Sequence, residues 1–191
     1  MAGIRDTMAA LVDRVEALLR DEGNVIWSEQ AIADELDRHR LRVNYAPCLG
    51  EPSYPAGVET FLTFVAPYGS WEEDVVLTDS QYTVVSTSNA DYQGGRFTIG
   101  SEPANRPVLV VGWTYDVYGC AEALISEYLI DLAGQFDFQA DGGSYSRSQK
   151  YDMYERLGQS YARKALGFSK NSGNGVVFTE MIRSDVNVQY L

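Results

Sequence analysis

Cysteine and histidine are scarce in this chain, which excludes several kinds of chemistry. Its two cysteines, Cys48 and Cys120, lie far apart and belong to no metal or redox motif. Two buried thiols in a reducing compartment explain them better than a disulfide framework. The single histidine, His39, cannot form a histidine-based metal site alone, and its position near a predicted helix end favours a capping or surface role. We therefore expect no metal site.

Long apolar runs are also missing. The longest, such as residues 108–111, are far shorter than the roughly 20 residues that a membrane span needs. The first residues contain no basic segment that leads into an apolar run, so we expect no signal peptide. With 45% apolar residues the chain can form one folded domain. We expect a soluble protein, made in a cytoplasm, that does not act at a membrane.

Positive charge is sparse, with 15 Lys and Arg against 27 Asp and Glu and a net charge of −12. A protein that grips a phosphate backbone needs clustered basic residues. The densest basic run here covers only residues 38–42, and the other basic residues are scattered. The composition therefore argues against specific nucleic-acid binding.

Each pattern that suggests catalysis has a simpler structural explanation. The acidic residues of 72–74 and of 34–37 are expected to be a solvated surface, since carboxylate catalysis needs groups that converge on a cleft. The glycines of 94–100 lack the Gly-Lys-Ser/Thr of a phosphate loop and predict a hairpin turn. Ser160 lies inside a predicted helix, with no strained elbow. We predict no catalytic residue and no cofactor.

Four helices and a group of short strands account for most of the sequence. Apolar spacings of three and four predict helices over residues 4–21 and from Ser28, a good N-cap, to about Arg40. Three prolines and two glycines within residues 44–57 then predict an irregular segment. Five runs rich in Val, Thr, Phe and Tyr follow, at residues 59–66, 74–78, 82–87, 96–101 and 107–113. They predict a small antiparallel β lobe over about residues 58–113.

A second helix pair is predicted after the β lobe, over residues 116–135 and 146–166. Ser146 and Gln149 match a capping box at the start of the later helix. The two helices form a predicted αα-hairpin, whose tyrosines at 118, 128, 154 and 161 have core spacing. The predicted fold class is thus α+β: a helical core of two amphipathic helix pairs with an inserted β lobe, as one domain over residues 1–167.

The last 24 residues, 168–191, are predicted to form an extended C-terminal arm. Ordering them costs about 1–2 kcal/mol per residue, which a lone strand cannot recover. The arm must pair with its own β lobe or dock on another chain, and its alternating pattern favours docking by β-strand addition. The apolar residues expected to bind the partner are Val176, Val177, Phe178, Met181, Ile182, Val186, Val188 and Tyr190.

A resemblance to a known family rests on about 55 residues around the second helix pair. The matching positions are Tyr115, Asp116, Tyr118 and Gly119 at the helix start, Phe136, Phe138, Asp141 and Gly142 in the loop, and Ser146 and Gln149 at the next helix. This combination resembles the head-to-tail adaptor (connector, or head completion) proteins of long-tailed bacteriophages. The first two helices and the segment around residues 47–57 match nothing in that family.

The resemblance implies a structural virion protein rather than an enzyme. Adaptors of this family form a dodecameric ring between the portal protein and a tail-side neck protein, and the ring lines the channel through which the genome leaves. Their C-terminal segment reaches neighbouring subunits. The matched residues are packing positions, so no catalytic role carries over. Another neck or tail-completion protein, a stopper or a tail terminator, is the main alternative, although those proteins are mostly β; a small cytoplasmic enzyme is a weaker one.

Overall fold

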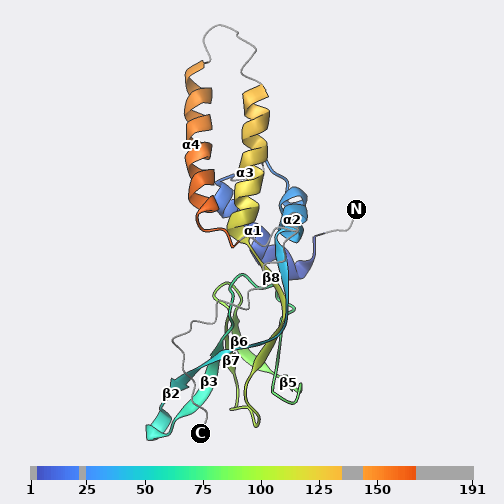
Figure 1. The fold of residues 1–191 in the computed structure, drawn as a ribbon, viewed down its shortest axis with the longest axis vertical. Helices are drawn as coiled ribbons and strands as arrows, with labels where there is room; N and C mark the ends of the chain where they lie inside the picture. The colour runs from blue at the N-terminus through green and yellow to red at the C-terminus, as the bar shows by residue number, and fades with distance from the viewer. Residues whose placement is uncertain (1–3, 22–24, 135–143, 167–191) are drawn as a thin grey trace.

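The computed structural model describes residues 4–21, 25–134 and 144–166. The molecule is elongated, with helices at one end, two β-sheets at the other, and a helical hairpin that projects from the helical end (Figure 1). In chain order the elements are η1 (Asp6–Met8), α1 (Ala9–Leu19), α2 (Glu29–Arg38), β1 (Arg40–Pro47), β2 (Leu49–Ser53), η2 (Pro55–Gly57), β3 (Thr60–Val65), β4 (Val76–Thr78), β5 (Val84–Val85), β6 (Thr87–Asp91), β7 (Arg96–Ile99), β8 (Leu109–Tyr115), α3 (Val117–Gly134) and α4 (Ser144–Ala162). The predicted α+β class is confirmed.

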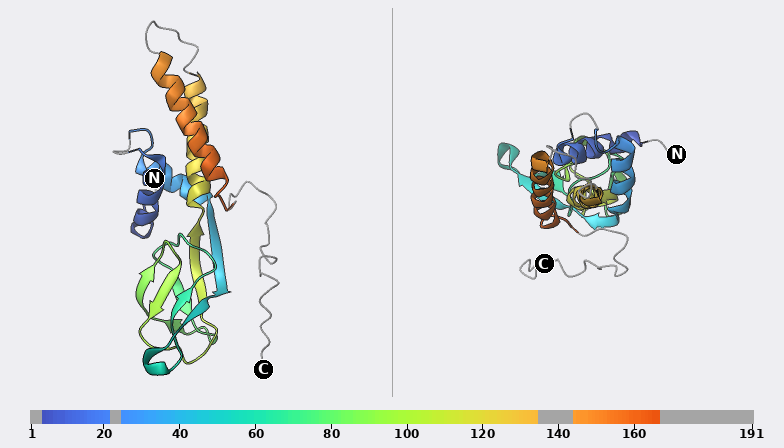
Figure 2. Two further views of the ribbon diagram at one scale, coloured as in Figure 1. Left: turned by 90° about the vertical axis from the view of Figure 1, so that its left-hand side faces the viewer. Right: turned by 90° about the horizontal axis from the view of Figure 1, so that it is seen from above.

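The helical part is built around α3. Seen from above, α1, α2 and α4 lie around it (Figure 2), and all three contact it. The predicted first helix is a 3₁₀ turn followed by α1, which ends where Arg20 adopts a left-handed backbone with φ 56°. The fully buried apolar side chains of this part include Met8, Val15, Leu19, Ile32, Leu36, Tyr115 and Ile125.

The start of α2 is confirmed, and its end is corrected. The Ser28 hydroxyl accepts a hydrogen bond from the Ala31 N–H at 3.2 Å, as an N-cap does. The helix stops at Arg38 instead of continuing to Arg40, because Arg40 already pairs with Tyr115 as the first residue of β1. Long-range pairing therefore sets this boundary.

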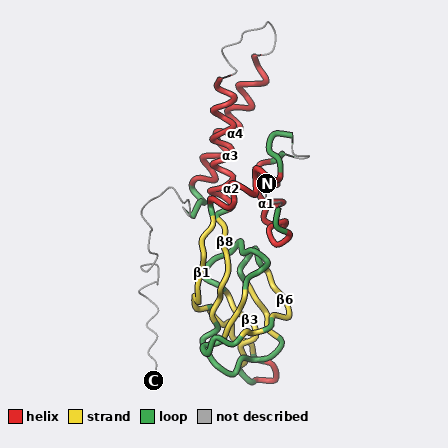
Figure 3. Tube along the Cα trace, turned by 90° about the vertical axis from the view of Figure 1, so that its right-hand side faces the viewer, coloured by secondary structure: helices red, strands yellow, loops and turns green. Residues whose placement is uncertain are grey.

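Two four-stranded antiparallel sheets form the β part. Their strand orders are β1-β8-β4-β5 and β2-β3-β7-β6. A tube view shows β1 and β8 as long strands that connect the sheets to the helices (Figure 3). The core between the sheets includes Trp71, Leu77, Phe97, Ile99 and Val110, each at most 2% exposed.

The β part begins earlier than predicted. Strands β1 and β2 occupy most of the segment that was expected to be irregular, so the sheets start at Arg40 rather than near residue 58 and end at Tyr115 rather than 113. Both strands lie at sheet edges, and their pairing shifts between Val43 and Ala46 and between Glu51 and Pro52. Proline is tolerated at edges and bulges, so the breaker residues did not prevent strand formation.

The remaining predicted strands agree with the structure, with one difference. The predicted run 82–87 contains β5 and only the first residue of β6, so most of β6 was not predicted; β5 and β6 belong to different sheets. The hairpin turn predicted at the glycines is confirmed: Asp91 pairs with Arg96, and Gly95 has φ 67°. A Cβ atom at Gly95 would also collide with the Tyr68 carbonyl, so this turn requires glycine.

The projecting hairpin consists of α3 and α4, which pack against each other. The predicted extent of α3 is confirmed, whereas α4 starts at Ser144, two residues before the predicted cap Ser146, and ends at Ala162 rather than 166. Serines at 144, 146 and 148 all suit a helix start, so the sequence alone could not decide at which serine α4 begins. No helix in the described ranges is long and apolar enough to cross a membrane.

Candidate functional site

Four of the ten residues that carry the family resemblance, Tyr115, Asp116, Tyr118 and Gly119, lie where β8 runs into α3, and Asp116 is the centre of this junction. Its backbone N–H donates to the His39 carbonyl at 2.9 Å, and its own carbonyl accepts from the Cys120 N–H at 2.9 Å. Its carboxylate accepts from the Gly119 N–H at 2.9 Å and from the Leu166 N–H at 2.6 Å. Asp116 therefore caps α3 and also connects it to the end of α2 and to the chain after α4.

Gly119 is required by this cap. A Cβ atom at Gly119 would lie 2.7 Å from Oδ2 of Asp116 and 3.1 Å from Nδ1 of His39. Neither atom belongs to a flexible side-chain end, since both residues are buried. The glycine three residues after the aspartate thus leaves room for the aspartate side chain to fold back over the helix start.

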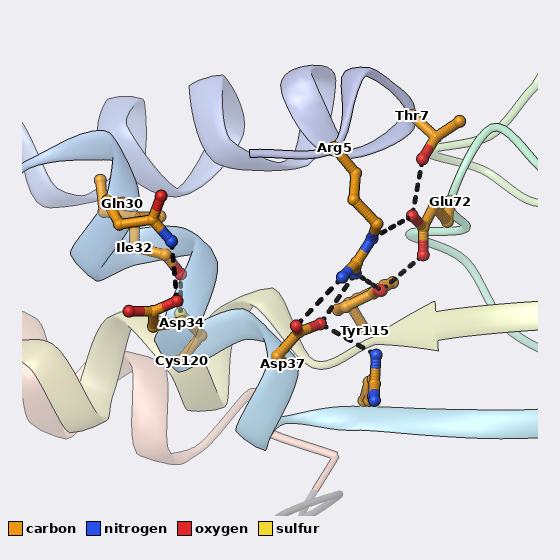
Figure 4. Close-up of polar contacts among 10 residues, drawn as sticks. Arg5, Thr7, Gln30, Ile32, Asp34, Asp37, Glu72, Tyr115 and Cys120 are labelled. Carbon is orange, nitrogen blue, oxygen red and sulfur yellow. Dashed lines mark hydrogen bonds and ion pairs between the residues drawn. The ribbon is translucent and has the colours of Figure 1, made fainter. Parts of the chain in front are cut away.

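Tyr115 belongs to a polar network beside the junction (Figure 4). Its hydroxyl donates to Oε2 of Glu72 at 2.6 Å and accepts from Arg5 at 3.0 Å. Arg5 also donates to Oε1 of Glu72 at 2.8 Å and to both carboxylate oxygens of Asp37 at 2.8 and 3.1 Å, while Thr7 donates to Glu72 at 2.7 Å. The network connects the N-terminal segment and α2 to the β part.

The electrostatics of the network stabilise ionised Glu72, neutral Tyr115 and protonated Arg5. Burial alone raises the pKa of Glu72, but hydrogen bonds from Tyr115, Arg5 and Thr7 outweigh it, so the pKa lies below its ordinary value. Burial and the neighbouring Glu72 raise the pKa of Tyr115, and the hydrogen bond to Asp37 raises that of Arg5. A carboxylate that already accepts three hydrogen bonds is poorly suited to take a proton from a substrate. The arrangement suits a structural clamp.

Two carboxylates that were expected to be solvated are buried. Glu72 is 2% exposed, and Glu35 is 9% exposed and accepts hydrogen bonds at 2.7 Å from Arg38 and at 3.1 Å from His39. The sequence could not show this for Glu72, because Arg5 and Thr7 are more than 60 positions away in the chain. Of the two roles expected for His39, capping is confirmed, since it is the C-cap of α2, and the surface role is wrong, since it is buried.

The predicted packing role of the tyrosines is confirmed. The rings of Tyr118 and Tyr161 lie 5.7 Å apart, and those of Tyr128 and Tyr154 lie 5.3 Å apart. Trp27 contacts the second pair edge-on, and the Tyr161 hydroxyl donates to the Leu18 carbonyl at 2.7 Å. These rings join α3 and α4 to α1 and to the segment before α2.

Most of the other predicted site residues are not tested by the structure. Ser146 and Gln149 belong to α4, but their side chains lie outside the described part. The loop residues Phe136, Phe138, Asp141 and Gly142 also lie outside the described residues, as does the whole C-terminal arm, 168–191, with its predicted partner-binding residues from Val176 to Tyr190. The predicted cap at Ser146 is wrong, because Ser146 already lies inside α4. The roles assigned to the loop residues and to the arm stay predictions.

The basic run and the cysteines offer no separate site. Arg38 pairs with Glu35, Arg40 pairs with Asp37, and Arg40 and Arg42 lie 4.3 and 5.1 Å from the Trp113 ring centre. Both cysteines are buried; burial raises the pKa of the Cys48 thiol to about 12 and that of Cys120 well above its ordinary value. Among the described residues, no group of three or more His, Cys, Asp and Glu is arranged to hold a metal ion.

The fold and this junction together define an α+β protein with two antiparallel sheets, whose best-organised polar residues support its architecture. Comparison with protein-family models, curated proteins and solved structures finds no match to this chain.

Proposed function

We propose that this chain is a structural virion protein: a head-to-tail adaptor that forms a dodecameric ring beneath the portal protein of a long-tailed bacteriophage. In this proposal it joins capsid to tail through contacts with the portal, with neighbouring adaptor subunits and with a tail-side neck protein. It is assembled in the host cytoplasm, becomes part of the virion neck and catalyses no reaction.

The observation that carries the proposal is the hydrogen bond from the Leu166 N–H to Asp116. An adaptor needs a stable body and an arm that leaves it at a defined point. Asp116, one of the residues behind the family resemblance, holds the chain at the last described residue before residues 168–191. Those 24 residues can span at most about 80 Å, far enough to reach a neighbour. The matched residues Tyr115 and Gly119 likewise serve packing and capping.

The acidic charge of the chain supports a channel that releases DNA easily. At −12 per subunit, a ring repels a phosphate backbone within a Debye length of about 8 Å at physiological salt. We therefore expect no retention of duplex DNA by micromolar protein in filter binding at physiological salt. Micromolar or tighter binding with a steep salt dependence would indicate a nucleic-acid-binding protein instead.

A second candidate is another neck protein, a stopper or a tail terminator. Such proteins are mostly β, and the two four-stranded sheets are more extensive than the sequence predicted. The four helices of the described residues, which include a long projecting hairpin, favour the adaptor.

The deciding experiment is co-expression with the portal protein encoded in the same genome, followed by negative-stain imaging. We expect the free chain to sediment mainly as a 21.2 kDa species and to form a ring only on the portal. A chain that ends at Gly167 should keep its helical circular dichroism yet fail to join the portal. A full-length chain that never binds the portal would overturn the adaptor assignment.

A further inference from the structure

The two helices of the projecting hairpin differ in charge. Helix α3, Val117–Gly134, contains three acidic residues and no basic one. Residues 150–166, in α4 and just after it, contain four basic and two acidic residues. The hairpin therefore offers surfaces that can attract each other between two copies of the chain.

The outer surface of α3 carries an exposed isoleucine between acidic residues. Ile130 is 73% exposed, and Glu127 and Asp131 beside it are exposed as well. Ile125 faces Gly158 of α4, and five residues later the helix has turned by about 140°, so Ile130 points away from α4. We call Glu127, Ile130 and Asp131 the acidic face.

The outer surface of α4 carries a hollow of about 500 Å³ next to the end of α1. Met153 on this surface is 43% exposed. We call the hollow the arginine groove; its lining residues are Arg20, Asp152, Met153, Arg156, Leu157 and Ser160. Two arginines against one aspartate, Asp152, give the lining a net positive charge, and together with the apolar Met153 and Leu157 they suit an apolar side chain that is flanked by carboxylates.

The two surfaces lie at the same height along the hairpin. Ile125 meets Gly158 and Tyr128 meets Tyr154, so each step up α3 corresponds to one step back along α4. Ile130 is therefore level with residues 152–153, and Glu127 with residues 155–156. Subunits of a ring are related by a rotation about the ring axis, with no translation along that axis. If the ring axis runs parallel to the hairpin, two surfaces that contact each other in neighbouring subunits must therefore lie at the same position along the hairpin.

We propose that the acidic face of one copy binds the arginine groove of the next, with Ile130 against Met153 and Leu157 and with Glu127 opposite Arg156. Within the described part of the chain neither Glu127 nor Arg156 forms an ion pair, so both charges are available to a second copy. The contact is head-to-tail and can close a ring. It rests on the proposed function and names the subunit interface of that ring.

Disulfide trapping tests this contact in the full chain. The double variant Ile130→Cys/Met153→Cys, oxidised with diamide at high concentration, should give a ladder of covalent oligomers on non-reducing gels. Each single variant is the matched control and should stay monomeric, because a head-to-tail contact never brings two copies of one position together. Background from Cys48 and Cys120 is low because both thiols are buried and their pKa values are raised.

Charge reversal sharpens the test. Adding Glu127→Arg to the double-cysteine chain should lower the oligomer yield about five-fold, the effect of about 1 kcal/mol for an exposed ion pair. Adding Arg156→Glu to that variant should restore the yield, because the pair is re-formed with exchanged signs. Glu73→Arg, an exposed position in the β part, makes the same change in net charge and should leave the yield unchanged.

The outcomes separate this inference from the adaptor proposal. Portal-bound rings of the natural chain without a ladder from the double variant would overturn the interface and leave the adaptor standing. A dimer from either single variant would indicate a two-fold contact and would also overturn the interface. A ladder from a chain that never joins the portal would support the contact and overturn the adaptor assignment.

Discussion

The helical and β parts differ in how the chain supplies their cores. The core of the β part comes from one continuous stretch, from Val43 to Val110. The helical core combines two stretches, Met8 to Leu36 and Tyr115 to Tyr161, which lie on either side of the β part. The β part is thus an insertion that must bring both halves of the helical core together. The β1–β8 ladder does this, since Arg40 pairs with Tyr115.

This difference places the junction residues at the most sensitive point of the molecule. Closing a loop of about seventy residues costs entropy, which the contacts at its ends must offset. Asp116 and the Arg5–Glu72–Tyr115 network supply contacts there. We therefore expect changes at the junction to disturb the helical part more than the β part.

The largest effect is expected from Asp116→Ala. The variant loses the α3 cap and leaves the buried Gly119 N–H and the partly buried Leu166 N–H without this acceptor, at a cost of about 2–4 kcal/mol in the free energy of unfolding. Urea denaturation measures the loss. In native-state hydrogen exchange, the exchange rates of the variant should increase more in α3 and α4 than in β3 and β7. Asp116→Asn keeps one acceptor oxygen and should lose less. Equal exchange in both parts would contradict the comparison.

A smaller effect, with a distinct pH dependence, is expected from Glu72→Gln. At neutral pH the variant loses charge-assisted hydrogen bonds, a cost of about 1–3 kcal/mol. Since the pKa of Glu72 is lowered by folding, its contribution is complete above its ordinary value of 4.5 and is lost as pH falls through the folded-state pKa. Urea midpoints between pH 7 and 3 should therefore fall less in the variant than in the natural protein. Glu73→Gln, at the exposed neighbouring position, is the control for the loss of one negative charge at neutral pH.

Gly119→Ala should destabilise the protein by about 1–2 kcal/mol. The added methyl group collides with Asp116 and His39, and this overpacking exceeds the gain of about 1 kcal/mol in helix propensity. Thermal unfolding would show the loss. Gly100→Ala is the control, because a Cβ atom there meets nothing within 4 Å. A stabilised Gly119→Ala variant would mean that the cap can move aside.

The smallest loss of stability is expected from a change on the exposed surface of the β1–β8 ladder. Arg42 lies 5.1 Å from the Trp113 ring centre at an exposed position, so Arg42→Ala should cost only about 0.5–1 kcal/mol. Chemical denaturation followed by tryptophan fluorescence would measure it. A loss comparable to that of Asp116→Ala would mean that the ladder surface, rather than the capped junction, holds the two parts together.

The fold could be predicted where its determinants are local. Periodic apolar residues located all four helices, and Ser28 capped α2 as expected. Strands β3 and β7 followed their β-branched and aromatic composition, whereas most of β6, Thr-Ser-Asn-Ala-Asp, lacks that composition and was missed. The prediction failed at β1 and β2, because pairing with distant strands overrode prolines that edge positions tolerate.

The sequence by itself determined the α+β class and the helix spacing, because these depend on residues a few positions apart. Only the tertiary structure decided that Glu72 is a buried clamp for Arg5, that Gly119 leaves space for the Asp116 cap, and that Asp116 holds the chain at Leu166. Each of the two distant contacts joins residues at least fifty positions apart. Such proximity arises from packing of the whole chain, which local sequence patterns do not encode.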